Sequence, residues 1–333
     1  MLLSKKSRAL SVMVSSVVLS LALTGCGSIS SAFKSYLADE AYPTLPDPEI
    51  ATYVLDLSLS TNPIAQLNAL NSGIDDFVSG KSLGNPFSSP KVKPRGLNMQ
   101  FITLSSGQAP RFLLVSAETS QELYSWMVDN TPNTDQAEPL WNGFIRAREI
   151  IYNEKTYNNI QACINQSVQL FGKQAKTEEV LREPARIICN DAAKTGRALQ
   201  SLQSFSSKPG IPLGSDVFGA IKISVNNMMK AREQFGNSRI TIAFASDMVD
   251  ENPKRNIFKV LGNIKIDACS LGKKLSTEDF GDQLPLSNFE IILVGLGNTA
   301  IYQGILENNR KFWNCYFENA GAEVREAPDL AGY

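Results

Sequence analysis

Histidine is absent from this chain of 333 residues. Nucleophile systems of the Ser–His–Asp and Cys–His types are therefore excluded. Zinc sites that need imidazole are excluded too, which leaves oxygen or thiolate as the ligands for any metal. An excess of one charge is also lacking, because 32 lysines and arginines face 33 aspartates and glutamates, for a formal net charge of −1. This balance provides no electrostatic reason to expect a nucleic acid partner.

Long apolar runs are missing as well, except for one near the amino terminus at residues 9–25. This run follows Lys5, Lys6 and Arg8, and it is too short and too rich in serine for a comfortable transmembrane helix. It leads into the tetrapeptide LTGC at residues 23–26, which resembles the lipobox of bacterial lipoproteins. The alternative is an ordinary secretory signal followed by an accidental cysteine.

The resemblance to a lipobox implies that residues 1–25 are a signal peptide and that Cys26 is lipidated and becomes the mature amino terminus. Several acyl chains then anchor the protein stably, since each buried methylene contributes roughly 0.8 kcal/mol. The residue after the cysteine is Gly27; an aspartate at this position would resemble an inner-membrane retention signal. We therefore expect the outer membrane and periplasm in a Gram-negative cell, and the cell surface otherwise. Residues 26–50 show little periodicity and include YPTLPDPE, which predicts a tether.

Beyond Cys26, four cysteines remain: Cys163, Cys189, Cys269 and Cys315. An even number in an oxidising compartment predicts two disulfides, for which three pairings are possible. Our prediction is nearest-neighbour pairing, Cys163 with Cys189 and Cys269 with Cys315. The alternative is four free buried thiols. The wide spacing shows no compact metal-ligand pattern.

Strand and helix patterns alternate along the rest of the chain. Apolar or β-rich segments that predict strands lie at residues 51–58, 97–106, 111–117, 239–247, 289–298 and 322–327. The second and third of these are joined by a short turn and predict a hairpin. The alternation predicts the α/β class, with a doubly wound, mostly parallel sheet built from residues 51–119 and 207–333. Residues 120–206 have helical spacing and few β signals, which predicts a helical insertion.

Two of the predicted strands end in an aspartate, Asp56 and Asp247. In parallel sheets, ligands bind beyond the carboxyl ends of the strands, where the strand order reverses. Asp56 opens the sequence DLSLS, in which Asp56, Ser58 and Ser60 lie two residues apart and so start out on one face. Ser215 offers a further hydroxyl ahead of an amphipathic helix. The alternative for the whole set is the polar face of an ordinary strand.

This combination resembles a von Willebrand factor type A domain with its metal ion-dependent adhesion site. The family pattern is D-x-S-x-S, a hydroxyl residue that opens a later helix, and an aspartate that ends a later strand. The resemblance implies that Mg²⁺ or Mn²⁺, which prefer oxygen ligands, is bound directly by the hydroxyls of Ser58, Ser60 and Ser215. Asp56 and Asp247 then act through waters and hydrogen bonds. The metal keeps an open position for a carboxylate from a protein or peptide partner.

Two positions depart from the family pattern. Ser215 replaces threonine, which keeps the hydroxyl but loses the methyl group that helps to fix its rotamer. Met248 follows Asp247 where glycine is common, so we expect a different path for that loop. For Ser215 alone, the alternative is a helix N-cap beside Asp216. Asp250 is expected in a solvated loop.

The expected function is a lipid-anchored binding module, not an enzyme. We expect the insertion at residues 120–206 to border the metal face and to shape the choice of partner. One alternative is a metal-dependent envelope hydrolase of phosphate or carboxylate esters, although Ser58 stands where an aspartyl phosphatase needs a second acid. Another alternative is a structural lipoprotein of an envelope assembly with a vestigial site.

Overall fold

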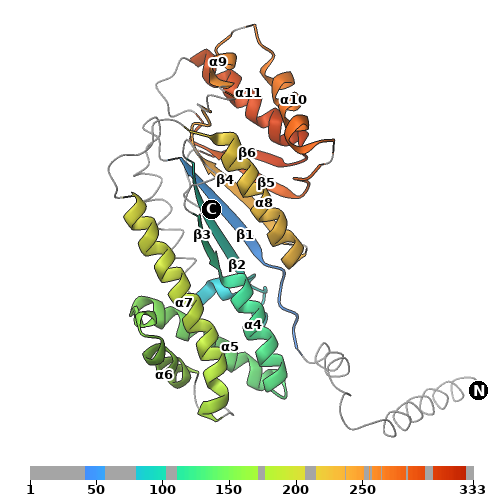
Figure 1. Ribbon diagram of the computed structural model, residues 1–333. Coiled ribbons are helices and arrows are strands. Elements are labelled where there is room, and N and C mark those ends of the chain that lie inside the picture. The colour runs from blue at the N-terminus through green and yellow to red at the C-terminus, as the bar shows by residue number, and fades with distance from the viewer. Residues whose placement is uncertain are drawn as a thin grey trace, which may run out of the picture.

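A six-stranded β-sheet organises the part of the chain that the computed structural model describes (Figure 1). The described residues are 42–56, 80–102, 111–171, 177–206, 215–236, 238–250, 255, 257–263, 265–282, 284–296 and 303–327. The strands are β1 (Glu49–Asp56), β2 (Arg95–Ile102), β3 (Arg111–Val115), β4 (Arg239–Ala245), β5 (Phe289–Val294) and β6 (Glu323–Ala327). Their order across the sheet is β3-β2-β1-β4-β5-β6.

The sheet is mostly parallel. Strands β2, β1, β4, β5 and β6 run parallel to their neighbours, and β3 lies antiparallel to β2 at one edge. The predicted α/β class is thus confirmed, and the β2–β3 pair confirms the predicted hairpin. The order 3-2-1-4-5-6 is that of a doubly wound sheet, in which the direction of winding reverses between β1 and β4.

Helices pack on both faces of the sheet. The helices are α4 (Ser116–Asn130), α5 (Thr134–Asn153), α6 (Ile160–Leu170), α7 (Glu178–Ser206), α8 (Val217–Phe235), α9 (Ile257–Leu261), α10 (Ala268–Phe280) and α11 (Gln303–Asn319). Side chains of β1, β4 and β5 alternate between two cores, as strand geometry requires. Val54 and Phe244 pack with α8 and α11, whereas Tyr53 and Leu55 on the other face share a core with Leu199 of α7.

The predicted helical character of residues 120–206 is confirmed, since α4 to α7 occupy this region. The helices begin earlier than predicted, at Ser116, because α4 follows β3 without a loop. They enclose an apolar core of their own, in which Trp141, Phe144 and Phe171 make edge-to-face ring contacts. The insertion is therefore a packed layer with its own hydrophobic centre.

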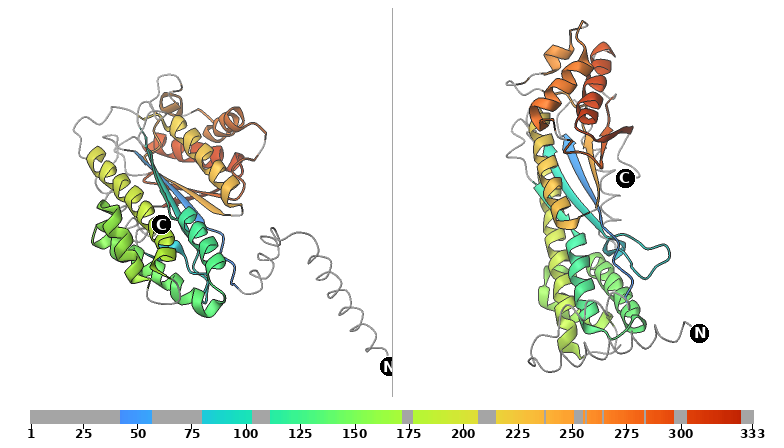
Figure 2. Two further views of the ribbon diagram at one scale, coloured as in Figure 1. Left: turned by 60° about the horizontal axis from the view of Figure 1, so that its bottom comes forward. Right: turned by 90° about the vertical axis from the view of Figure 1, so that its right-hand side faces the viewer.

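Helices α4, α5 and α6 lie at the amino-terminal ends of the parallel strands, whereas α7 runs back along the sheet, where Leu199 shares a core with Leu55 near the end of β1 (Figure 1 and Figure 2). That the insertion borders the metal face stays a prediction. Ala117 at the start of α4 shares a core with Ile50 near the start of β1. Trp141 Nε1 donates a hydrogen bond of 3.0 Å to the carbonyl of Gly84, in the segment before β2. The physical reason is the antiparallel β3, which ends where its neighbours begin and so directs α4 away from their carboxyl ends.

Residues 42–48, predicted as part of a tether, pack against the insertion instead. The hydroxyl of Tyr42 donates to the carbonyl of Thr131 at 2.7 Å, and the hydroxyl of Tyr124 donates to that of Pro43 at 3.0 Å. The phenol ring of Tyr42 belongs to the core of the insertion. The folded body thus starts before β1, because a buried tyrosine holds the segment in place.

Both cysteine pairs lie at disulfide distance and match the nearest-neighbour prediction. Cys163–Cys189 joins α6 to α7 inside the insertion, with Cα atoms 6.0 Å apart. Cys269–Cys315 joins α10 to α11, with Cα atoms 5.2 Å apart. Within the described ranges, none of the helices has the length and apolar character needed to span a membrane.

Candidate metal centre

Three of the five predicted metal-site residues lie at the carboxyl edge of the sheet, where the strand order reverses between β1 and β4. Asp56 is the last residue of β1, and Asp247 follows β4 by two residues. Ser215 stands two residues before α8. All three side chains are buried. Ser58, Ser60 and the lipidation candidate Cys26 lie outside the described residues.

Asp56 receives hydrogen bonds from two hydroxyls that are distant in the sequence. Ser215 Oγ donates to the carboxylate and lies 3.1 Å from each of its oxygens. Ser246 Oγ, one residue before Asp247, donates to Asp56 Oδ2 at 2.7 Å. The parallel pairing of β1 with β4 places Ser246 there, since the preceding residues of the two strands are register partners.

The orientation of Ser215 argues against the helix N-cap alternative. The cap of α8 is Asp216, whose side chain accepts from the amide of Gly219 at 3.0 Å. A second acid, Asp250, accepts from the amide of Val217 at 3.0 Å. The first turn of α8 therefore has carboxylate partners, and the hydroxyl of Ser215 is directed to Asp56 instead.

The loop that carries Asp247 is held by several hydrogen bonds. Ser246 Oγ accepts from the amide of Met248 at 2.8 Å, and Asp247 Oδ1 accepts from that of Val249 at 3.0 Å. From α11, Asn309 Nδ2 donates to the Asp247 carbonyl and Trp313 Nε1 to the Met248 carbonyl, each at 2.8 Å. The backbone of this loop is therefore tied to both the sheet and α11.

Met248 adopts a backbone φ of 57°, in the left-handed region that glycine enters without a steric penalty. The loop thus takes a conformation that suits glycine, although a larger residue occupies it. The physical reason is tertiary, because the Met248 side chain is fully buried in the core while its amide and carbonyl are both hydrogen-bonded.

Asp250 is buried, which corrects the expectation of a solvated loop. Its side chain is 2% exposed, and among the described residues Oδ2 has no hydrogen-bond partner. The pKa of Asp250 is raised to about 7, mainly by burial and to a smaller extent by the nearby carboxylate of Asp216. The amide of Val217 and the charge of Arg255 lower the pKa in opposition. Asp250 is therefore a carboxyl group that the fold holds partly protonated near neutral pH.

The donor set at this edge suits a hard cation. Ser215 donates a hydrogen bond to Asp56, so the lone pairs of its oxygen stay available to an ion. Ionised carboxylates that share a buried site repel one another, and a bound cation would offset such repulsion between Asp56 and Asp247. Among the described residues no group of three or more histidine, cysteine, aspartate and glutamate side chains is placed to hold a metal.

Sequence reasoning missed Ser246, Asn309 and Trp313. The sequence did offer a signal for Ser246, because its hydroxyl directly precedes Asp247, the aspartate at the end of a predicted strand. Asn309 and Trp313 lie four residues apart on one face of α11, but nothing local shows which loop that face meets. Comparisons with models of protein families, with curated proteins and with solved structures found no match to this chain.

We expect Ser246→Ala to lower the free energy of unfolding by about 1–3 kcal/mol, because it removes a donor to the buried Asp56 and an acceptor for the Met248 amide. Urea unfolding measures the change. Ser276→Ala is the matched control, since Ser276 is equally buried and its hydroxyl has no hydrogen-bond partner within the described ranges. Equal losses in both variants would show that the Ser246 hydroxyl contributes nothing specific.

Proposed function

We propose that the protein is a bacterial envelope lipoprotein whose type A-like domain binds Mg²⁺ or Mn²⁺ at the carboxyl edge of the sheet. Asp56, Ser58, Ser60, Ser215 and Asp247 would hold the ion. When bound, the cation supplies an electrophilic position that accepts a carboxylate from a protein or peptide partner. The proposed role is binding, not catalysis, and the protein would be held at its membrane by lipid on Cys26.

One observation carries the proposal above all others. Asp56 and Ser215, 159 residues apart in the sequence, make direct hydrogen bonds in a buried position at the reversal of strand order. Because Asp56 accepts a hydrogen bond from the hydroxyl instead of pointing into solvent, it orients the Ser215 oxygen as the resemblance implies for a metal ligand. An ordinary polar strand face has no need to bury and connect these groups.

Calorimetric titration of the full protein with Mg²⁺ and with Mn²⁺ tests the metal. Binding is expected for the wild type and should be lost in Asp56→Ala and in Asp247→Ala, with far-UV circular dichroism confirming that both variants fold. Asp267→Ala is the control, because Asp267 is an aspartate that caps α10 and is not one of the predicted ligands. Binding by the wild type that survives in both site variants would place the metal elsewhere. No binding by the wild type would favour a structural lipoprotein.

The lipid anchor has a separate test. Cys26→Ser is expected to release the protein from membranes in flotation assays of cell lysates, because the cysteine carries the proposed acyl chains. Metal affinity should stay unchanged in this variant, since the substitution lies outside the proposed site. Continued flotation of Cys26→Ser would contradict the anchor without affecting the metal proposal.

A further inference from the structure

A structured loop stands out from the amino-terminal edge of the sheet, between η1 (Gly80–Leu83) and β2 (Figure 2, right). Asn85 and Val92 close the loop with two backbone hydrogen bonds of 2.7 and 3.1 Å. Inside it, Ser88 Oγ donates to the carbonyl of Pro90 at 2.8 Å and accepts from the amide of Val92 at 3.1 Å. We call residues 85–93 the β2 loop, and these internal hydrogen bonds give it a defined shape.

The surface of the β2 loop combines an apolar side chain with cations. Val92 is 43% exposed, one of four large apolar side chains with high exposure in the described part of the chain. Three exposed cations lie next to it in the sequence: Lys91, Lys93 and Arg95. Asp47 and Glu49 offset part of this charge, and Glu49 pairs with Lys93 at 3.3 Å in contact with solvent. An apolar side chain between lysines suits the headgroup region of a bilayer, where acyl chains and phosphates are both within reach.

The β2 loop lies beside the segment through which the proposed lipid anchor is connected to the folded body. Lys91 Nζ donates to the carbonyl of Thr44 at 3.2 Å, and Tyr42, two residues earlier, is held by α4. Cys26 precedes Tyr42 by 16 residues (42 − 26), which span at most about 55 Å when fully extended. A tether of this length keeps the loop at a high effective concentration near the bilayer, so that a modest attraction is sufficient.

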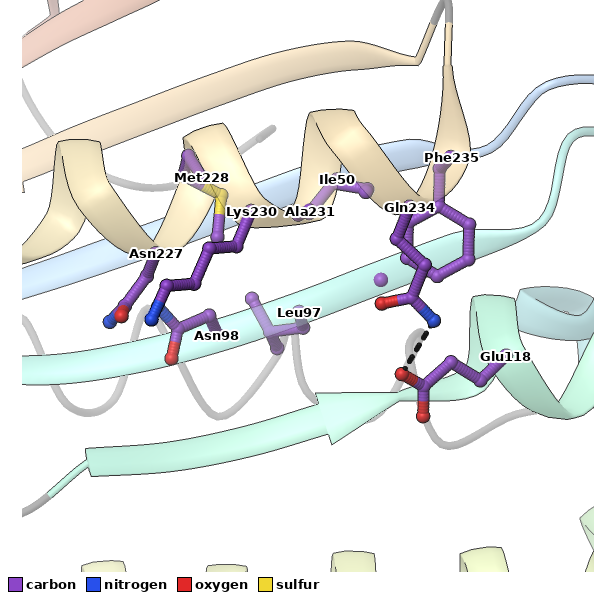
Figure 3. A pocket seen from close by; sticks show the side chains of 11 residues that line it. Ile50, Leu97, Asn98, Glu118, Asn227, Met228, Lys230, Ala231, Gln234 and Phe235 are labelled. Atoms are coloured by element: carbon purple, nitrogen blue, oxygen red, sulfur yellow. Dashed lines mark hydrogen bonds between the residues drawn. The ribbon is translucent and has the colours of Figure 1, made fainter.

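Two other surfaces at this end of the protein are less suited to an anionic bilayer. The corner between α4 and α5 exposes the carboxylates of Asp129 and Asp135. The groove between α8 and β2 carries Glu118 and Lys230 at its two ends, so that its charges balance (Figure 3). Anionic lipids attract cations and repel carboxylates. The β2 loop is therefore the surface at this end whose charge complements such lipids.

We propose that the β2 loop docks on an anionic lipid surface. Val92 enters the boundary of the acyl chains, while Lys91, Lys93 and Arg95 contact phosphates. This inference rests on the proposed lipid anchor at Cys26, which brings the bilayer within reach. Docking through the amino-terminal edge of the sheet leaves the opposite edge, with the candidate metal centre, facing away from the membrane. The metal is thereby presented to a partner in the aqueous compartment or on an opposing surface.

Methyl NMR of the lipidated protein in nanodiscs tests the docking, with a gadolinium-chelating lipid as the relaxation probe. In discs rich in phosphatidylglycerol, the methyl signals of Val92 are expected to be lost, because paramagnetic relaxation is strong only close to the headgroups. Val260 is the matched probe, since it is 41% exposed but lies on α9, and its signals should remain. In discs of neutral phosphatidylcholine, the Val92 signals should return. An equal loss in neutral discs would overturn the role of the cations.

Two pairs of lysine substitutions separate the loop from the rest of the surface. Lys91→Gln with Lys93→Gln is expected to restore the Val92 signals, since two fewer cations lower the docked population about tenfold or more. Lys273→Gln with Lys274→Gln removes two exposed cations from α10 and should leave the loss unchanged. Unchanged positions of the remaining methyl signals verify that both variants fold.

The outcomes distinguish the docking from the anchor. Equal loss of the Val92 and Val260 signals, or no loss of either in discs that carry the protein, would overturn the docking while the anchor stands. Loss of the Val92 signals that persists in the Lys91→Gln, Lys93→Gln variant would also overturn it. Protein that elutes apart from the discs in size-exclusion chromatography would contradict the anchor itself, and this inference with it.

Discussion

Replacing Arg148 with methionine is expected to lower the free energy of unfolding by about 3–5 kcal/mol, because it breaks a buried ion pair from one side. Arg148 is 1% exposed, and its Nε and Nη2 lie 3.1 Å from Asp191 Oδ2. The guanidinium also donates to the hydroxyls of Ser82 and Ser116. A single side chain of α5 thus connects α7, the start of α4 and the segment before β2. Methionine would leave Asp191 buried without its cation.

Urea unfolding measures this loss of stability, and two further variants test whether it comes from the unpaired buried charge. The double variant Arg148→Met with Asp191→Leu is expected to recover most of the lost stability, since no uncompensated charge remains. Arg310→Met removes an exposed pair with Glu326 and should cost about 1 kcal/mol or less. The explanation fails if Arg148→Met is no more destabilising than Arg310→Met.

Asp250→Asn is expected to stabilise the protein at pH 9 and to change its stability little at pH 4. Burial raises the pKa of Asp250 to about 7, above its ordinary value of 3.8. The folded state therefore holds the proton more tightly than the unfolded chain. The protonated acid contributes stability that is fully present below about pH 4 and is lost as the pH rises through 7. Asparagine resembles the protonated acid and does not lose this contribution.

The shift from 3.8 to about 7 corresponds to about 4 kcal/mol at high pH. Thermal unfolding of both proteins between pH 4 and pH 9, in the presence of EDTA, measures the difference. Asp267→Asn is the control, because hydrogen bonds from the hydroxyl and amide of Ser270 lower the pKa of Asp267. Because the folded state favours the ionised form of Asp267, Asp267→Asn should not raise the stability of the protein at high pH. A stability curve of Asp250→Asn parallel to the wild type would show that Asp250 is ionised throughout.

Local patterns in the sequence were sufficient for the strands and for the alternation around Asp56. The apolar segments around Phe244 and Leu293 form β4 and β5, because runs buried on both faces stabilise parallel strands whatever their exact neighbours are. The nearest-neighbour pairing of the four cysteines, one of the three that the sequence allows, matches the structure. Ser215 and Asp247 could be nominated because each stands at a strand end or a helix start, positions that the sequence itself marks.

The contacts that assemble the site depend on strand order, which no local pattern contains. Strand β1 pairs with β2, the next strand along the chain, on one side and with β4 on the other. The pairing with β4 is what brings Ser246 to Asp56. The burial of Asp250 and the left-handed backbone of Met248 likewise result from packing against α8 and α11.

The sequence by itself determined which residues are chemically able to form a metal site and on which face of a strand they begin. The tertiary structure alone decided which of them touch, and it placed helices α4 to α6 at the other end of the sheet. The reason is that side-chain periodicity is a property of a few consecutive residues. Proximity at the sheet edge, by contrast, depends on the pairing of strands some 190 residues apart, as for Asp56 and Ser246.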